Sequence, residues 1–267
     1  MSERASERDN YLIQPDDYIA LGNRQSQIGN ALGALAAYDF PKGTLRERAV
    51  SLAPNSVKAY NYRGSFKFAR LGDIAGALTD FDSAICYDPD YAVAYANRGL
   101  LRYQQLGDIP GALADLNLAL VLNPRDASTY HTRGLIKYAE LGDIEYALAD
   151  YDKAIEIDPN FAAAYNCWGL LKNVHFQDIS GAIADYDCDL DLDPFLSEAY
   201  YNRGTIYHKE LSDPVKALAD YDRAISIDPN LAAAYYVRGL LKRDATIDDL
   251  VGAASDLAVA LALDPRL

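Results

Sequence analysis

The fold is decided by residues 126–160, DASTYHTRGLIKYAELGDIEYALADYDKAIEIDPN, because this stretch is one copy of a unit that recurs along most of the chain. Glycine recurs every 35 residues, at Gly64, Gly99, Gly134, Gly169, Gly204 and Gly239. Tyrosine keeps the same spacing, at Tyr60, Tyr95, Tyr130, Tyr165, Tyr200 and Tyr235. Proline also follows it, at Pro89, Pro124, Pro159, Pro194 and Pro229, and slips by one residue at Pro265. Three registered columns with this period predict a solenoid of stacked repeats.

Each unit is predicted to form two helices joined by a short loop. In the first helix, Tyr130, Gly134 and Tyr138 are spaced so that they share one helical face. Asp143 follows a Leu-Gly break and is placed to cap the second helix by accepting from its open amide groups. The second helix has an apolar stripe and ends before Pro159, because proline disfavours helical geometry in the preceding residue. Neither helix is long enough to be stable alone, so we expect stacking to supply the burial.

The unit carries a residue signature in both helices. Its members are a tyrosine at the head of the first helix, a glycine four residues later, an alanine early in the second helix, an aromatic residue and a closing proline: Tyr130, Gly134, Ala147, Tyr151 and Pro159. This signature resembles the tetratricopeptide repeat. The units here are one residue longer than is usual in that family, and most carry arginine before the glycine. The resemblance implies an all-α, right-handed superhelical solenoid of antiparallel helix pairs with about seven repeats.

The chain divides into three parts. Residues 1–15 are charged, and we expect them to be disordered. Residues 16–55 contain a divergent repeat with a loop insertion, which we interpret as a cap, with a special function as the alternative. Residues 56–267 contain six regular repeats: 56–90, 91–125, 126–160, 161–195, 196–230 and 231–267.

The composition favours a protein partner over nucleic acid. The chain has 267 residues, a formal net charge of −14 and a pI near 4.5, whereas counterion release from nucleic acid needs a basic surface. Its three cysteines, Cys86, Cys167 and Cys188, lack metal-ligand spacing and do not make a disulfide framework. No apolar segment predicts a signal peptide or a membrane span, so we expect a cytoplasmic protein without a cofactor or metal.

Two charged columns of opposite sign share the repeat period. Arginine precedes the glycine in five units, at Arg63, Arg98, Arg133, Arg203 and Arg238. Aspartate occupies one position of every second helix, at Asp80, Asp115, Asp150, Asp185, Asp220 and Asp256. We expect structural ion pairs between the two helices, with an anion-binding ladder as the alternative.

The fourth regular repeat departs from the pattern. Trp168 replaces the arginine, Asn173 replaces an aromatic residue, and Gln177 replaces the loop glycine. Asp189 stands where other second helices carry alanine. Such departures mark function or strain. The alternative is that Trp168 merely fills the space of the missing arginine.

Two chemical interpretations of this repeat are weak. Asp187, Asp189 and Asp191 have the spacing of a calcium loop, but the position that needs glycine for the sharp turn holds leucine, and the segment is predicted to be helical. An enzyme would need an activated nucleophile, and the candidate in this repeat is a pair of Cys167 with His175. No catalytic motif supports one. An enzyme centred on this repeat is therefore a distant alternative.

The resemblance also implies a binding surface. In this family the first helices line a concave groove that holds extended peptides or partner helices. Carried over by position, the groove presents aromatic, aliphatic and amide side chains: Asn61, Phe68, Leu100, Tyr103, His131, Leu135, Asn166, Leu170, Asn173, Tyr201 and Tyr236. Amides and aromatic rings suit an extended peptide. We therefore expect a non-catalytic scaffold or assembly factor that binds a protein or peptide.

The last predicted helix supports a second hypothesis. It is apolar on almost every side, with Leu257, Val259, Leu261 and Leu263 close together. A helix without a polar face usually hides that face against something, so we expect self-association through these residues, and a structural homo-oligomer is the alternative function. Small exposed side chains that cost little stability would explain the pattern equally well.

Overall fold

The structure, a computed structural model, describes residues 50, 55–244 and 247–267. Within them the regular secondary structure is helical throughout, as expected for an all-α solenoid. The expected disordered segment 1–15, and nearly all of the divergent repeat expected at 16–55, lie outside the described residues.

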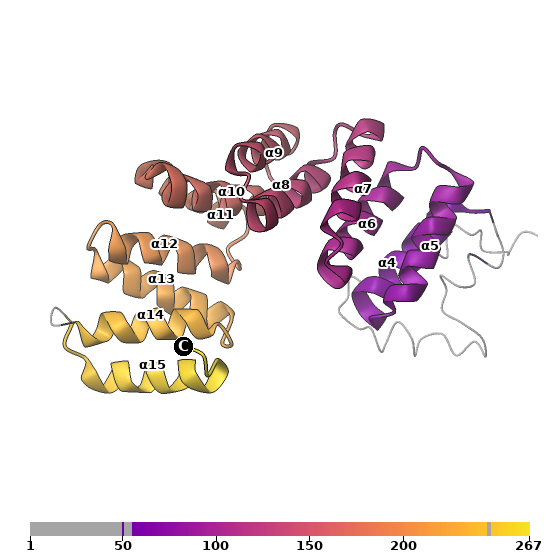
Figure 1. The fold of residues 1–267 in the computed structure, drawn as a ribbon. Helices are drawn as coiled ribbons and strands as arrows, with labels where there is room; N and C mark the ends of the chain where they lie inside the picture. The colour runs from indigo at the N-terminus through magenta and orange to yellow at the C-terminus, as the bar shows by residue number, and fades with distance from the viewer. Residues whose placement is uncertain (1–49, 51–54, 245–246) are drawn as a thin grey trace, which may run out of the picture. The chain divides into compact units, whose positions relative to one another are not determined.

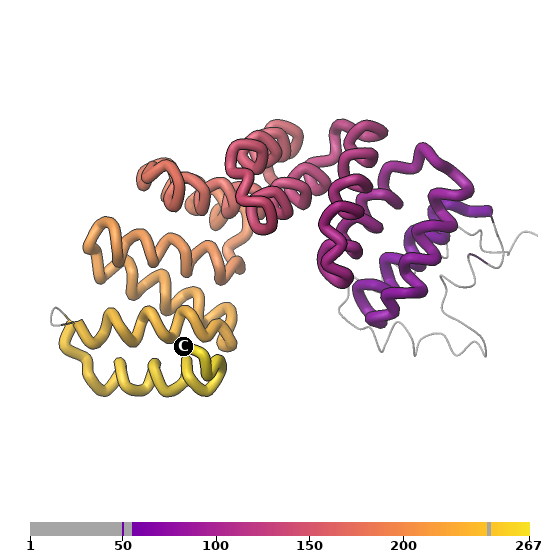
Figure 2. The backbone as a smooth tube through the Cα atoms, in the orientation of Figure 1, coloured from indigo at the N-terminus to yellow at the C-terminus, as the bar shows by residue number. Residues whose placement is uncertain are grey.

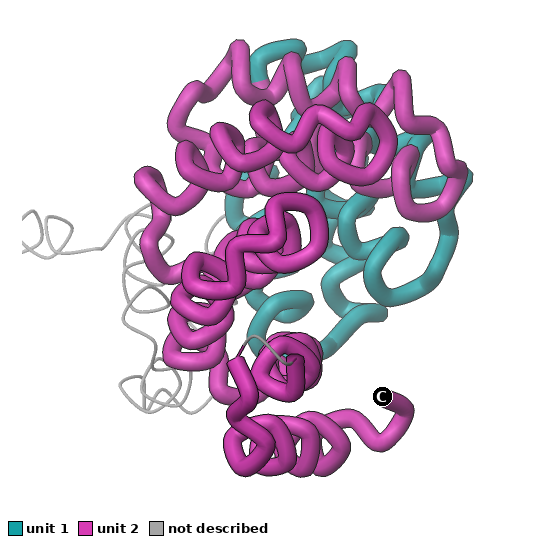
Figure 3. Tube along the Cα trace, turned by 90° about the vertical axis from the view of Figure 1, so that its left-hand side faces the viewer, with its two compact units in different colours: residues 1–125 teal, residues 126–267 magenta. Residues whose placement is uncertain are grey.

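The chain forms two compact units, residues 1–125 and 126–267, which are coloured separately in Figure 3. The described part of the first unit contains two helix pairs (Figures 1 and 2): α4 (Val57–Phe66) with α5 (Ile74–Tyr87), and α6 (Ala92–Leu101) with α7 (Ile109–Leu122). The first helix of each pair continues into a π-helical turn, η2 (Lys67–Leu71) after α4 and η3 (Arg102–Leu106) after α6.

The second unit stacks four helix pairs. They are α8 (Ala127–Leu141) with α9 (Ile144–Ile157), α10 (Ala162–Leu171) with α11 (Ile179–Leu192), α12 (Ser197–Lys209) with α13 (Pro214–Ile227), and α14 (Ala232–Arg243) with α15 (Leu250–Leu263). A π-helical turn, η4 (Lys172–Phe176), extends α10. In Figure 1 the helices α12 to α15 lie side by side in chain order. No helix among the described residues has the length and apolar character needed to cross a bilayer.

Aspartate caps every second helix in the described chain. A side-chain oxygen of the capping residue accepts a hydrogen bond from the backbone N–H three residues later, at Asp73, Asp108, Asp143, Asp178, Asp213 and Asp249. The prediction for Asp143 is confirmed. Each such cap satisfies one of the amide donors that the start of a helix leaves open.

The loop residue before each cap adopts left-handed backbone geometry. Glycine supplies it in three repeats, with φ of 64° at Gly72, 60° at Gly107 and 63° at Gly142. The next two repeats use Gln177, at 51°, and Ser212, at 50°. Because a side chain disfavours this region, these two positions hold a strained conformation that the surrounding helices enforce.

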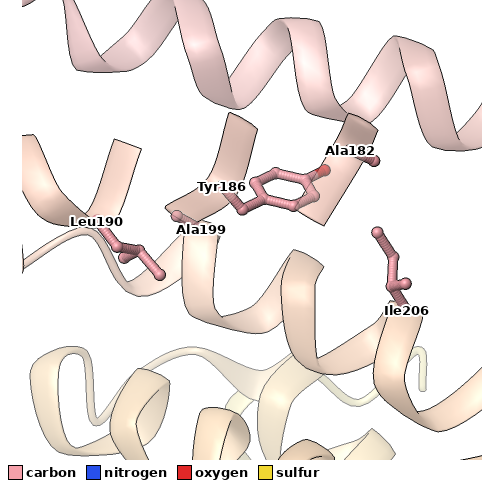
Figure 4. Close-up of a cluster of buried hydrophobic side chains, with 5 residues drawn as sticks. All are labelled: Ala182, Tyr186, Leu190, Ala199 and Ile206. Carbon is pink, nitrogen blue, oxygen red and sulfur yellow. The ribbon is translucent and has the colours of Figure 1, made fainter. Parts of the chain in front are cut away.

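Close approach between the two helices of a pair depends on the glycine column. A Cβ atom on Gly134 would lie 2.7 Å from the ring of Tyr151, so α8 and α9 could not keep their spacing with a larger residue there. Between neighbouring pairs, small and large apolar residues interlock. Figure 4 shows one such cluster, in which Ala182, Tyr186 and Leu190 of α11 meet α12.

Candidate functional site

The two charged columns form ion pairs within each repeat. In the second repeat, Arg98 donates to both carboxylate oxygens of Asp115, over 2.9 Å from Nε and 2.7 Å from Nη2. Arg63, Arg133, Arg203 and Arg238 bind the aspartate of their own repeat in the same bidentate way. The aspartate side chains are almost fully buried. The prediction of structural ion pairs is confirmed, because these arginines hold the two helices of a repeat together.

The same arginines also connect consecutive repeats. Arg98 donates to Asp82 over 2.6 Å, and Arg238 donates to Asp222 over 2.6 Å. In the fourth repeat Trp168 takes this role, because its indole N–H donates to Asp152. Asp185 then keeps an ion pair with Lys172, whose Nζ lies 2.7 Å from the carboxylate and 3.8 Å from the centre of the Trp168 ring. Trp168 thus takes over the link to the preceding repeat that arginine makes elsewhere, and the carboxylate of Asp185 is paired through Lys172.

Adjacent first helices meet through amide side chains. The Asn97 amide donates to Asn61 over 2.9 Å, and the Asn202 amide donates to Asn166 over 3.1 Å. Each contact joins residues 36 positions apart. Asn61 is buried by this arrangement. Its side-chain amide therefore stabilises the contact between repeats and is not exposed on the surface.

A cavity of about 680 Å³ opens among α10, η4, α11 and α12 of the second unit. Its lining combines apolar walls with amide, hydroxyl and charged groups: Leu170, Asn173, Val174, Gln177, Ile179, Tyr186, Tyr201, Asn202, Thr205, Lys209 and Glu210. Its volume lies in the range of small-ligand pockets. Of the predicted groove residues, it brings together Leu170, Asn173 and Tyr201.

The cavity coincides with the irregular repeat. One repeat earlier, the position of Asn173 holds Tyr138, which packs against the buried cluster of Tyr151 and Leu171. Asparagine is too small to fill that space, and Tyr201 stands as an aromatic wall from α12. The departures from the repeat pattern at Asn173 and Gln177 therefore line a cavity.

The other predicted groove residues do not line this cavity. Phe68, Leu100, Tyr103, His131, Leu135, Asn166 and Tyr236 are half-buried on their first helices. Phe68 packs against the core cluster of Phe81 and Leu101. Sequence reasoning did not single out Tyr186, Asn202 or Lys209 as parts of a site, because it compared equivalent positions rather than neighbouring helices.

Cys167 in the fourth repeat has a different partner from His175, the histidine that the sequence suggested. Cys167 Sγ lies 3.5 Å from Nε2 of His131, whereas His175 lies 3.4 Å from the Tyr138 hydroxyl. Burial raises the pKa of Cys167 to about 11 and lowers the pKa of His131 to about 4. Both groups are neutral at pH 7, so the pair lacks the thiolate that nucleophilic catalysis needs.

Asp189 is an isolated buried carboxyl group. Its side chain is 0% exposed, and neither oxygen has a hydrogen-bond partner among the described residues. Burial, and then the charge of Asp193, raise the pKa of Asp189 to about 7. The three aspartates with the spacing of a calcium loop have different surroundings in the structure, because Asp187 pairs with Arg203 while Asp191 is exposed.

The four apolar residues of α15 differ in their surroundings. Leu257 is half-buried, and its Cγ would lie 3.0 Å from a Cβ on Gly239 of α14. Leu263 is as exposed as its equivalent Leu192 in α11. Leu261 is distinctive, since it is 49% exposed while its equivalent Leu190 is 7% exposed beneath α12.

Two family models match the sequence. Both are described as tetratricopeptide repeat, and they cover residues 100–166 and 197–231. No curated protein matches the sequence.

Solved structures share the fold at low sequence identity. A chain of the APC/C hetero-tetramer Cut9–Hcn1 matches 98% of this chain with a TM-score of 0.75 and 18% identity. This chain spans about half of that one, 48% of its length. PilF from Pseudomonas aeruginosa matches 79% of this chain and 93% of its own, with a TM-score of 0.70 and 21% identity. YrrB, described as a repeat protein with an unusual peptide-binding site, matches 72% of this chain and 97% of its own, with a TM-score of 0.53 and 21% identity.

Proposed function

Because this chain is built of tetratricopeptide repeats, we propose that it is a scaffold that holds an extended segment of a partner protein. The observation that carries the proposal is the cavity at the irregular fourth repeat. Similar structures include the Cut9–Hcn1 assembly and the YrrB repeat protein with its peptide-binding site. A net charge of −14 disfavours nucleic acid as the partner.

The cavity has the chemistry that peptide binding requires. Leu170, Val174 and Tyr201 offer apolar and aromatic surface for a side chain. The side-chain amides of Asn173 and Gln177 make no hydrogen bond within the described part of the chain, so they are available to a peptide backbone. Each amide offers both donors and acceptors, as an extended backbone does.

A substitution that closes the cavity tests this proposal. Asn173→Tyr restores the residue type that fills the equivalent place in the third repeat, where Tyr138 packs against the core. The variant should therefore fold, with the cavity largely occupied. His208→Tyr alters the same repeat position in α12, outside the cavity lining, and serves as the control.

The assay is affinity capture from the native cells with tagged full-length chains, followed by quantitative mass spectrometry. We expect proteins retained by the wild-type chain and by His208→Tyr to be lost with Asn173→Tyr. Circular dichroism of each variant shows that the helices are intact. Equal capture of the same proteins by the closed variant would contradict binding at this cavity.

Exposure of Leu261 supports a second candidate, self-association through α15. In α11 the equivalent Leu190 is buried against α12, while Leu261 leaves about half of its surface open. A second copy covering this face would bury Leu261 together with Val259. Light scattering across a concentration series tests it: the mass should rise with concentration, and Leu261→Glu should abolish the rise. A mass that stays at one chain throughout would exclude it.

Catalysis forms no part of the proposal. Cys167 and His131 are both neutral at pH 7, so this pair does not supply an activated nucleophile.

A further inference from the structure

The floor of the cavity contains a buried phenol with an unpaired hydroxyl group. Tyr186 is 1% exposed and lines the cavity. The outer end of its ring lies against α10, since Cζ would be 3.2 Å from a Cβ on Gly169. Figure 4 shows the ring directed along α11 toward Ala182. Within the described residues the Tyr186 hydroxyl takes part in no hydrogen bond.

The next repeat shows one side chain that can pair with this hydroxyl. Tyr221 occupies the position of Tyr186 one repeat later, and its hydroxyl lies 3.4 Å from Nδ1 of His208. The residue equivalent to His208 in the fourth repeat is Asn173, on the cavity lining. Asn173 therefore does not give the Tyr186 hydroxyl the partner that His208 gives to Tyr221.

The remaining walls restrict the kind of group that fits. Leu170, Val174 and Tyr201 require an apolar or aromatic body. Lys209 and Glu210 stand side by side in sequence with opposite charges, so they give the lining no net charge. Burying an ionised group among these walls would cost its hydration without a dedicated counter-charge. A neutral side chain with a polar tip fits best.

We propose that this cavity receives a tyrosine side chain of the bound partner, with its hydroxyl group paired to that of Tyr186. The inference rests on the proposed function and specifies which side chain anchors the peptide. Phenylalanine would fill the same volume but leave the Tyr186 hydroxyl buried and unpaired, which is unfavourable. Tryptophan carries its N–H on the side of the ring rather than at the tip. Arginine would bring a charge into a lining whose own charged groups, Lys209 and Glu210, sum to zero.

Blocked amino acids are suitable probes because they isolate one side chain. N-acetyl-tyrosinamide, N-acetyl-phenylalaninamide and N-acetyl-argininamide are titrated into the full ¹⁵N-labelled chain, and the side-chain amide signals of Asn173 and Asn202 are followed by NMR. We expect the tyrosine probe to bind about 3- to 10-fold more tightly than the phenylalanine probe, as one neutral hydrogen bond allows.

Tyr186→Phe supplies the decisive variant. Phe81 occupies the same position in the first repeat, fully buried, so phenylalanine is compatible with the packing. In this variant the preference for the tyrosine probe should disappear. Tyr221→Phe removes a hydroxyl group outside the cavity and should leave the preference unchanged.

Three results would overturn the inference: no probe shifting the amide signals, the phenylalanine or arginine probe binding as tightly as the tyrosine probe, or the preference persisting in Tyr186→Phe. These outcomes are separable from failure of the proposed function. If Asn173→Tyr abolishes partner capture while the probes show no tyrosine preference, the cavity binds a partner through another side chain.

Discussion

Replacing Asp189 with alanine should make the protein more stable at neutral and alkaline pH. The carboxyl group is fully buried without a hydrogen-bond partner among the described residues, and its pKa is raised to about 7 by burial and by Asp193. Tyr186 on its own helix and Cys167 on α10 both interact with Asp189. Burial and the charge of Asp193 both oppose its ionisation.

The magnitude follows from the pKa. A carboxyl group in the unfolded chain titrates near 3.9, and each pKa unit corresponds to about 1.4 kcal/mol. A rise to about 7 therefore costs the folded chain about 4 kcal/mol once Asp189 is ionised. Below the unfolded pKa both states are protonated and the cost vanishes. Between pH 4 and 7 the unfolded chain loses this proton while the folded chain retains it, so stability falls as the pH rises.

The variant removes this pH dependence. Alanine occupies the position in other repeats, where Ala154 and Ala224 are fully buried, so the backbone accepts it. At pH 8 we expect Asp189→Ala to raise the free energy of unfolding by up to about 4 kcal/mol, and at pH 4 to change it by less than about 1 kcal/mol.

Urea unfolding followed by far-UV circular dichroism at pH 4, 6 and 8 measures the difference in the free energy of unfolding between the wild type and Asp189→Ala. Contributions from titrating groups that both proteins share cancel in this difference. Asp191→Ala, an exposed carboxylate on the same helix, is the matched control and should show no such trend. A difference that stays constant from pH 4 to 8 would refute the argument, because it would mean that Asp189 titrates like a solvated carboxylate.

Two further substitutions test the repeat architecture. Arg203→Ala leaves Asp220 almost fully buried without its bidentate partner, so the free energy of unfolding at pH 7 should fall by about 3–5 kcal/mol. Arg266→Ala, at an 88% exposed side chain, is the control and should leave the stability unchanged. Ser212→Gly removes the side chain from a position with a positive φ of 50°, so the free energy of unfolding should rise by about 1 kcal/mol and the melting temperature should rise with it. A lower melting temperature would mean that the serine side chain stabilises the loop.

The helix pairs and their ion pairs could be predicted because each depends on one repeat. The apolar stripe, the capping aspartate and the Arg–Asp spacing lie within a single unit, so their geometry follows from helical periodicity. The period itself then predicted the stacking. The replacement of arginine by Trp168 could also be interpreted, because the other repeats show which contact the side chain at this position makes.

The cavity could not be located in the same way. Contacts between first helices join residues 36 or 37 positions apart, such as His131 with Cys167 and Tyr138 with His175, whereas equivalent positions are 35 apart. The offset depends on how far one helix slides along the next. The sequence suggested His175 for Cys167 because both lie in one repeat, whereas the histidine beside the thiol, His131, belongs to the preceding repeat.

The arrangement of the fourth repeat argues that its irregular residues act together. Trp168 keeps the link to Asp152 that arginine makes elsewhere, and Lys172 retains the ion pair with Asp185, so the polar connections of the stack survive. The neighbouring exchange to Asn173 has no comparable compensation, since it leaves a cavity. Random loss of the repeat pattern would be expected to damage connections and packing alike. A repeat that preserves its connections while opening one cavity is the outcome expected where a surface is retained for binding.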